Sequence, residues 1–227
     1  MEYDLHIHSR YSFDSRMEPR KIIDVARRQG LAGIAIVDHD SVGGGLEGAS
    51  ICPADFVVIP GMERHTVRGD IIGLFVKEAV TDTYDPAEVI QAIHEQGGLA
   101  LLPHPTRSQL ATMEPELLGR LDLFEGFNAR RHRDGPRAAG GVSWVAETAR
   151  RYGKGTTGGS DAHFYGEIGS GRTVIPAATL DEAKAALLRG NLICTGRPSS
   201  RIFQVMSMLL GQFGARKPAL PDGPDLH

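Results

Sequence analysis

Short apolar runs bounded by polar residues recur along the chain, and helical patterns separate them. This rhythm is typical of a βα repeat. A repeat of this kind forms either a closed barrel or an open doubly wound sheet, and both carry their functional sites at the carboxyl ends of the strands. We predict seven strands, at Tyr3 to Ile7, Gly33 to Val37, Phe56 to Pro60, Ile71 to Val76, Leu99 to Leu102, Leu121 to Phe127 and Gly155 to Gly158.

Start and stop signals predict helices between these strands. Pro19 lies in the first turn of one helix, and Gly30 ends it. Asp85 caps the start of a second helix, which stops at Gly97. Further helices are expected from Pro136 to Tyr152 and from Leu180 to Leu188.

The length of the chain suits one sizeable domain. We expect this domain to span residues 1–200. Residues 201–213 have the pattern of an amphipathic helix, which we expect to pack on the domain rather than to anchor a membrane or to bind a partner helix. Residues 214–227 contain three prolines and should form a flexible tail.

Metal-capable side chains follow six of the predicted strands at the point where each strand ends. Because alternate residues of a strand point the same way, His6 and His8 share one face. A single His-x-His pair can arise by chance. Metal-capable residues scattered by chance, however, would fall at strand starts and in helices as often as at strand ends. The other strand ends supply Asp38, His39 and Asp40, then Glu63, His104, Glu125 with Asn128, and Asp161 with His163.

Asp70 is an apparent exception, because it precedes its strand. The stretch from Gly61 to Gly69 is too short for a crossover helix, so the two strands that flank it should form an antiparallel hairpin. A hairpin returns the start of its second strand to the end of its first. Asp70 is therefore predicted at the same edge of the sheet as Glu63.

This set of histidines and carboxylates predicts a metal centre. It exceeds what one ion can bind, so we expect two or three divalent ions with at least one bridging carboxylate. Histidine and carboxylate ligands without paired cysteines favour manganese, zinc, iron or magnesium.

Four motifs in this order resemble the PHP (polymerase and histidinol phosphatase) superfamily of metal-dependent phosphoesterases. The resemblance covers residues 2–198. The motifs are Asp4-Leu5-His6-Ile7-His8-Ser9 with Ser12-Phe13-Asp14-Ser15, Ile34-Ala35-Ile36-Val37-Asp38-His39-Asp40, Pro103-His104-Pro105, and Gly159-Ser160-Asp161-Ala162-His163. The resemblance implies an α/β fold, a distorted (β/α)7 TIM-like barrel with three metal ions at its carboxyl rim.

The resemblance also implies a ligand set for each ion. Glu63 would bridge the first and second ions. Asp70 stands where many relatives have a histidine, a departure that affects the second ion. The implied ligands are His6, His8, Glu63 and Asp161 for the first ion, Glu63, His104 and Asp70 for the second, and Asp14, His39 and His163 for the third.

The implied activity is hydrolysis of a phosphate ester by attack of a metal-bridging hydroxide on phosphorus. Asp161 or His163 could also move a proton to the leaving oxygen, and at least one of Asp38 and Asp40, which flank His39, is expected to orient its ring. The substrate would be a small molecule, a nucleotide or the end of a short oligonucleotide. Candidate substrate-binding residues at the rim are Arg130, Asn128, Arg10, Arg197 and His65.

Three other hypotheses for the function stay open. One is a catalytically silent, metal-stabilised binding module, another is a histidinol-phosphatase-like monoesterase, and a third is a C–N hydrolase of the amidohydrolase type. The third hypothesis is disfavoured, because no lysine lies at a strand end near the predicted ligands.

Composition and charge limit the partners and the cellular location that we expect. A net charge of −3 argues against a stable nucleic-acid partner. No apolar stretch is long enough to span a membrane, and the first residues lack the pattern of a signal peptide. The two cysteines, Cys52 and Cys194, suit reduced thiols, so we expect a cytoplasmic protein. The sequence does not indicate an oligomeric state.

Overall fold

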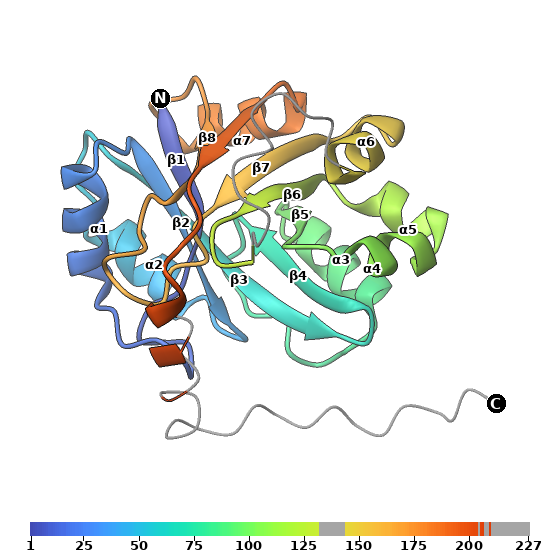
Figure 1. The fold of residues 1–227 in the computed structure, drawn as a ribbon, viewed down its shortest axis with the longest axis horizontal. Helices are drawn as coiled ribbons and strands as arrows, with labels where there is room; N and C mark the ends of the chain where they lie inside the picture. Colours follow the sequence, from blue (N-terminus) through green and yellow to red (C-terminus); the bar gives the residue numbers. More distant parts are fainter. Residues whose placement is uncertain (132–143, 204, 207–208, 210–227) are drawn as a thin grey trace.

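Strands β1 to β7 form the wall of a nearly closed barrel in the computed structural model, which describes residues 1–131, 144–203, 205–206 and 209 (Figure 1). The sheet order is β7-β6-β5-β4-β3-β2-β1-β8-β9. The barrel closes where β1 meets the end of β7, because the His8 amide donates to the Ala162 carbonyl at 2.9 Å. The wall strands are β1 (Glu2–Ile7), β2 (Gly33–His39), β3 (Val57–Thr66), β4 (Gly69–Leu74), β5 (Leu99–Leu102), β6 (Leu123–Asn128) and β7 (Gly155–Gly159).

The predicted hairpin is present. Strands β3 and β4 are antiparallel, and His65 is the register partner of Asp70. This pairing returns the start of β4 to the end of β3, which carries Glu63. Strand β5 is antiparallel to β4, and the β1–β2, β2–β3, β5–β6 and β6–β7 pairs are parallel. The α/β barrel predicted from the sequence is confirmed, with one reversed strand.

An irregularity in β1 adjusts which residues face the interior. The pairing of β1 with β2 shifts between Asp4 and Ile7. Leu5 belongs to the inner apolar cluster, while Ile7 packs in the outer cluster with α1 (Pro19–Arg28). A bulge of this kind re-aims side chains, and bulges are common beside active sites. As a result, His6 and His8 both point into the rim of the barrel.

Helix α7 (Leu180–Arg189) closes the opposite end of the barrel. Its buried face packs into the inner cluster with residues at the starts of β1, β3 and β5. The hydroxyl of Tyr3 in this cluster donates to the Ala177 carbonyl at 2.9 Å. The members from α7 are Ala183, Ala186 and Leu187, and those from the strand starts are Tyr3, Val57 and Leu99.

The remaining described helices cover the outer face of the barrel (Figure 1). Helix α1 packs over β1 and β2, with α2 (Gly43–Ser50) beside it. Helices α3 (Pro86–Glu95), α5 (Pro115–Arg120) and α6 (Trp144–Arg151) cover β4 to β6, and α4 (Arg107–Thr112) lies near α6.

Sequence patterns missed several short elements, namely α2, α4, α5, β8 (Gly171–Val174) and β9 (Ile193–Gly196). Helix α2 starts with three glycines, which disfavour helix in isolation. They are needed here for close packing, because a Cβ atom on Gly45 would lie 2.7 Å from the Cα of Pro60.

Two predicted helices lie partly outside the described residues. Helix α6 coincides with the C-terminal part of the helix predicted from Pro136 to Tyr152. Residues 136–143 of that prediction lie outside the described residues. Of the segment 201–213, residues 201–203, 205–206 and 209 are described and helical. Phe203 packs on Phe164, whereas the largely exposed side chains are Ile202, Val205, Met206 and Leu209. Packing of the whole segment stays a prediction, and the tail 214–227 lies outside the described residues.

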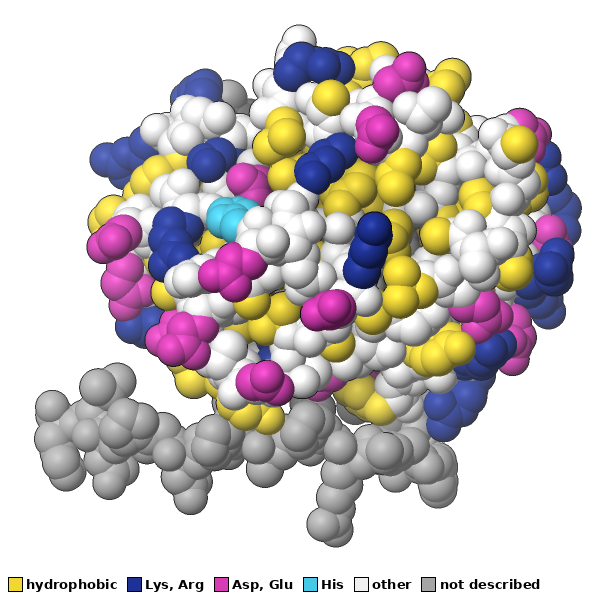
Figure 2. All heavy atoms as spheres, turned by 180° about the vertical axis from the view of Figure 1, so that it is seen from behind, with side chains coloured by type: hydrophobic (Ala, Val, Ile, Leu, Met, Phe, Trp, Pro, Cys, Tyr) yellow, Lys and Arg dark blue, Asp and Glu magenta, His cyan; other side chains and the backbone are white. Residues whose placement is uncertain are grey.

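Acidic and basic side chains are interspersed over the face of the molecule opposite to Figure 1 (Figure 2). No described helix combines the length and the apolar character that crossing a bilayer requires.

Candidate metal centre

Eight side chains from distant parts of the chain meet at the carboxyl rim of the barrel. They form three overlapping groups in which one nitrogen or oxygen atom of each member lies within 4.8 Å of the others. Among the described residues, these groups are His8, Asp14, His39 and His163, then His6, His8 and Asp161, and finally His6, Glu63 and His104. The structure thus brings together all the predicted ligands except Asp70.

His6 and His8 lie at the centre of the site. Their Nε2 atoms are 3.1 Å apart. Both Nε2 atoms face Glu63 Oε2, at 3.5 Å from His6 and 3.3 Å from His8. Both also face Asp161 Oδ1, at 3.6 and 3.5 Å. Two imidazoles and two carboxylates therefore converge on one point.

The outer nitrogens of these two rings have hydrogen-bond partners. His6 Nδ1 lies 3.0 Å from Glu125 Oε1, and His8 Nδ1 lies 3.1 Å from the Ser12 hydroxyl. A neutral ring that donates through Nδ1 has its lone pair on Nε2. Two such lone pairs 3.1 Å apart repel each other unless a proton or a metal ion lies between them. A cation between them and the two carboxylates would remove the repulsion, so this donor set fits a metal ion.

Glu63 links the groups. Its Oε2 also lies 3.4 Å from His39 Nδ1, and its Oε1 lies 3.4 Å from His104 Nε2. Oε1 is buried and has no well-formed hydrogen bond among the described residues, and the same holds for Asp14 Oδ1. Buried carboxylate oxygens without hydrogen bonds are unusual unless a cation binds them. These two atoms are a second sign that the site fits metal ions.

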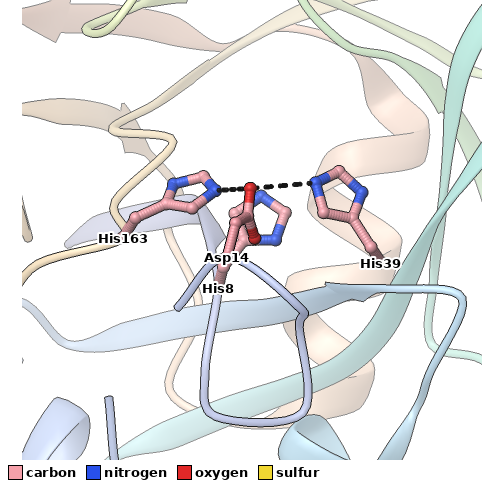
Figure 3. A group of neighbouring side chains, drawn as sticks. All are labelled: His8, Asp14, His39 and His163. Carbon is pink, nitrogen blue, oxygen red and sulfur yellow. Dashed lines mark hydrogen bonds and ion pairs between the residues drawn. The ribbon is translucent and has the colours of Figure 1, made fainter. Parts of the chain in front are cut away.

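Asp14 lies between His39 and His163 (Figure 3). Its Oδ2 is 2.9 Å from His163 Nε2 and 3.7 Å from His39 Nε2. The three residues come from the β1–α1 loop, the end of β2 and the loop after β7. The His39 ring also stacks on Phe13, with 5.0 Å between the ring centroids.

Opposite charges shift the ionisation of the site. Burial acts to lower the pKa of His6, but the carboxylates of Asp161, Glu125 and Glu63 hold that pKa well above its ordinary value. Burial acts to raise the pKa of Glu63, but the charges of His39 and His6 hold it well below. The same balance lowers the pKa values of Asp14 and Asp161 and raises that of His104. Such mutual stabilisation of charged groups is a common mark of functional sites.

Backbone strain is concentrated at this rim. His104 has a φ angle of 41° and Asp161 has one of 56°, in a region that side chains other than glycine rarely adopt. The His104 amide donates to Glu125 Oε2 at 2.9 Å. Strained residues persist where surrounding contacts hold them, and they cluster at functional sites.

Asp38 lies behind the ligands rather than in the opening of the site. It accepts hydrogen bonds from the Ser9 amide at 2.5 Å, the Ser9 hydroxyl at 2.7 Å and the Ser12 hydroxyl at 3.1 Å. Because Ser12 contacts His8 Nδ1, Asp38 supports His8. It makes no described contact with the ring of His39, which we expected Asp38 or Asp40 to orient.

Asp4 has a similar supporting position. Its carboxylate accepts from the Ser160 amide at 2.9 Å and the Gly169 amide at 2.8 Å. These bonds tie the loop that carries Asp161 to β1. Burial raises the pKa of Asp4 to about 6, while the hydrogen bonds from Ser160, Gly169 and His6 act to lower it.

Asp70 reaches the edge of the site. Its Oδ2 lies 4.0 Å from His104 Nε2, and its Oδ1 lies 2.5 Å from His65 Nδ1. His65, which the sequence suggested as a substrate residue, is therefore the partner of Asp70. Asp40 faces away from the ligands, because the buried Arg64 guanidinium binds it at 2.7 Å.

The other predicted substrate residues lie in different settings. Arg130 Nη1 is 2.9 Å from His163 Nδ1. Asn128 donates to Glu125 Oε2 at 2.9 Å and to Asp161 Oδ2 at 3.3 Å. Arg10 forms exposed ion pairs with Glu18 and Glu47, and Arg197 donates through its amide to the Ser170 carbonyl.

Two carboxylates at the site were not singled out as functional residues. Glu125 was predicted at the rim, and its contacts with His6 and His104 only emerge in three dimensions. Glu167 is buried, and Arg130 Nε lies 3.1 Å from its Oε1. Sequence offered a signal for Glu125, because it ends a strand, but none for Glu167, which lies in a loop.

Comparisons with known proteins agree with this geometry. A family model described as PHP domain matches residues 4–105, and one described as PHP-associated matches residues 145–192. Residues from 193 onward lie outside both matches. The uncharacterized proteins MJ1587 and MJ0417 of Methanocaldococcus jannaschii are 40% and 32% identical to this chain, over 147 and 178 residues. The alignments cover 60% of this chain and 85% of MJ1587, and 75% of this chain and 68% of MJ0417.

A solved structure has the same fold. It is a two-domain protein from Bacteroides vulgatus that contains a predicted PHP-like metal-dependent phosphoesterase. The TM-score is 0.67 at 17% identity, and the match covers 93% of this chain and 70% of that one.

Proposed function

Because this chain belongs to the PHP-domain family, we propose that it is a metal-dependent phosphoesterase that hydrolyses phosphate esters at a centre of two or three divalent ions. The convergence of the His6 and His8 Nε2 atoms on the carboxylates of Glu63 and Asp161 carries this proposal. Manganese, zinc, iron or magnesium would suit these donors. The substrate class is a small-molecule or nucleotide phosphate.

The family resemblance implies three ligand sets, and the three groups at the rim contain most of their members. The first ion would be held by His6, His8, Glu63 and Asp161, the second by Glu63, His104 and Asp70, and the third by Asp14, His39 and His163. Divalent ions in these positions supply Lewis acidity, which lowers the pKa of water and offsets the charge of a phosphate group.

The protein's own groups have defined tasks in this reaction. Glu125 and Ser12 hold the rings of His6 and His8 in one orientation, and Asp38 holds Ser12. Arg130 offers a guanidinium beside His163, where it would bind a phosphate oxygen. His163 and Asp161 are the candidates to move a proton to the leaving oxygen.

A metal and turnover assay of a matched pair of variants tests this function. Protein loaded with manganese or zinc should contain at least two ions per chain and hydrolyse an aryl phosphate. We expect His8→Ala to lose metal and to lower turnover at least ~10³-fold, because His8 belongs to two of the three groups. His94→Ala is the control, since His94 is an exposed residue on α3 that pairs with Asp122.

The alternative is a binding module without catalysis. Metal-loaded protein that hydrolyses neither aryl phosphates nor phosphodiesters, and a His8→Ala variant that behaves like wild type, would support the module and exclude the phosphoesterase. Fewer than two ions after reconstitution would exclude the proposed centre.

A further inference from the structure

The segment after β9 passes directly beside Arg130. The Ser199 amide donates to the Ala129 carbonyl at 2.8 Å, so the segment runs along the end of β6. Further on, the Phe203 carbonyl accepts from Arg130 Nη2 at 3.1 Å. The Phe203 ring stacks on Phe164, with 5.6 Å between centroids. Three contacts thus attach residues 199–203 to the rim of the barrel.

Glu167 joins this segment to the metal centre. Its Oε1 accepts from the Ser199 hydroxyl at 2.7 Å and lies 3.1 Å from Arg130 Nε. Its Oε2 accepts from the amides of His163 and Phe164 at 3.0 and 3.2 Å. A buried carboxylate needs a compensating positive charge, and the Arg130 guanidinium supplies it. One side chain therefore contacts the turn that carries a candidate ligand, a candidate phosphate-binding cation and the segment after β9.

These contacts hold the guanidinium at two corners. Glu167 forms an ion pair at Nε without a hydrogen bond, and Nη2 donates to the Phe203 carbonyl, so the group is restrained on two sides. The third corner, Nη1, is thereby directed to the metal centre, 2.9 Å from His163 Nδ1. A planar cation held in advance loses less conformational entropy when it binds a phosphate oxygen.

We propose that Glu167, Ser199 and the Phe203 carbonyl position Arg130 to bind the phosphate group of the substrate. They are positioning residues, because they act through Arg130 and do not contact the reacting atoms. This inference rests on the proposed function, in which Arg130 faces the substrate. It makes residues 199–203 part of the active-site wall.

The test measures binding of inorganic phosphate to the manganese-loaded full-length protein by calorimetry. We expect Arg130→Lys to weaken phosphate binding ~10- to 30-fold, Glu167→Gln ~10-fold and Ser199→Ala ~3-fold. Metal content should stay at the wild-type level in all three. The Ser50→Ala control alters an exposed serine on α2 and should leave phosphate binding unchanged.

Double variants separate positioning from a general structural effect. In an Arg130→Lys background, Glu167→Gln and Ser199→Ala should produce no further loss, because their effect passes through the guanidinium. Ser199→Ala keeps the inference testable if Glu167→Gln disturbs the turn of His163. Equal losses in both backgrounds, no loss from either variant, or no phosphate binding by wild type would overturn the inference. Phosphate binding with the expected coupling but without turnover would overturn only the phosphoesterase proposal.

Discussion

The two ends of this barrel are built from the same strands but carry opposite chemistry. At the carboxyl rim, buried histidines and carboxylates face one another, and three residues there, Asp40, His104 and Asp161, have positive φ angles. At the other end, Tyr3, Ala183, Ala186 and Leu187 form part of a continuous apolar cluster. The rim holds buried charged groups that an isolated fold would avoid, whereas the α7 end supplies apolar burial. The comparison suggests that function and stability can be altered separately.

The largest expected effect is at the α7 end. Leu187 is 1% exposed, so Leu187→Ala should lower the free energy of unfolding by about 2–5 kcal/mol through lost burial and a residual cavity. Urea denaturation measures this change. The adjacent Leu188 is 58% exposed, and Leu188→Ala should have almost no effect. Similar losses for both variants would show that α7 does not close the barrel as described.

A smaller effect is expected behind the rim. Ser12→Ala removes the partner of His8 Nδ1 and should weaken metal binding about 10- to 100-fold, because this hydroxyl orients the ring. Titration with manganese or zinc under competition from a chelator measures the affinity. The unfolding free energy of the metal-free protein should fall by about 1–3 kcal/mol as well, because the buried hydroxyl also bonds Asp38 and the His39 amide. Ser108→Ala on α4 is the exposed control, and equal affinity of both variants would contradict a supporting role for Ser12.

The smallest effect concerns pH. The pKa values of His6 and His104 are raised in the folded protein, so both rings bind protons more tightly when folded. Their contribution to the free energy of unfolding is fully present below the unfolded-state pKa of about 6.5. It is lost as the pH rises through the pKa values of the folded protein. The free energy of unfolding of the metal-free protein should therefore fall by up to about 1.4 kcal/mol for each ring and for each pH unit above about pH 6.5. Asp4, whose pKa is about 6, is already mostly ionised where this pH range begins, so it adds little to the slope.

Urea midpoints at pH 6.5, 7.5 and 8.5 in the presence of a chelator measure this slope, and the pH values are chosen around the histidine value of about 6.5. Manganese should abolish or reverse the slope, since metal ions replace protons on the rings. A stability that stays constant over this range without metal would contradict the raised pKa values.

Much of the rim could be predicted from sequence because its signals are local. The alternation of a strand brings His6 and His8 to one side, and the bulge in β1 preserves that outcome. The short stretch before Asp70 required a hairpin, which the structure confirms. The prediction for Asp38 was less complete, since its contact with Ser9 and Ser12 depends on how the loop after β1 folds back.

The network around Arg130 shows where sequence reasoning ends. Sequence alone determined the seven strands of the barrel wall, the strand ends that carry metal-capable residues, and the family. Only the tertiary structure decided that Glu167, Ser199 and Phe203 surround Arg130 and that α7 closes the far end. The reason is physical. Strand alternation and turn length act between near neighbours, whereas the contacts around Arg130 join residues up to 73 positions apart and those of α7 join residues still further apart.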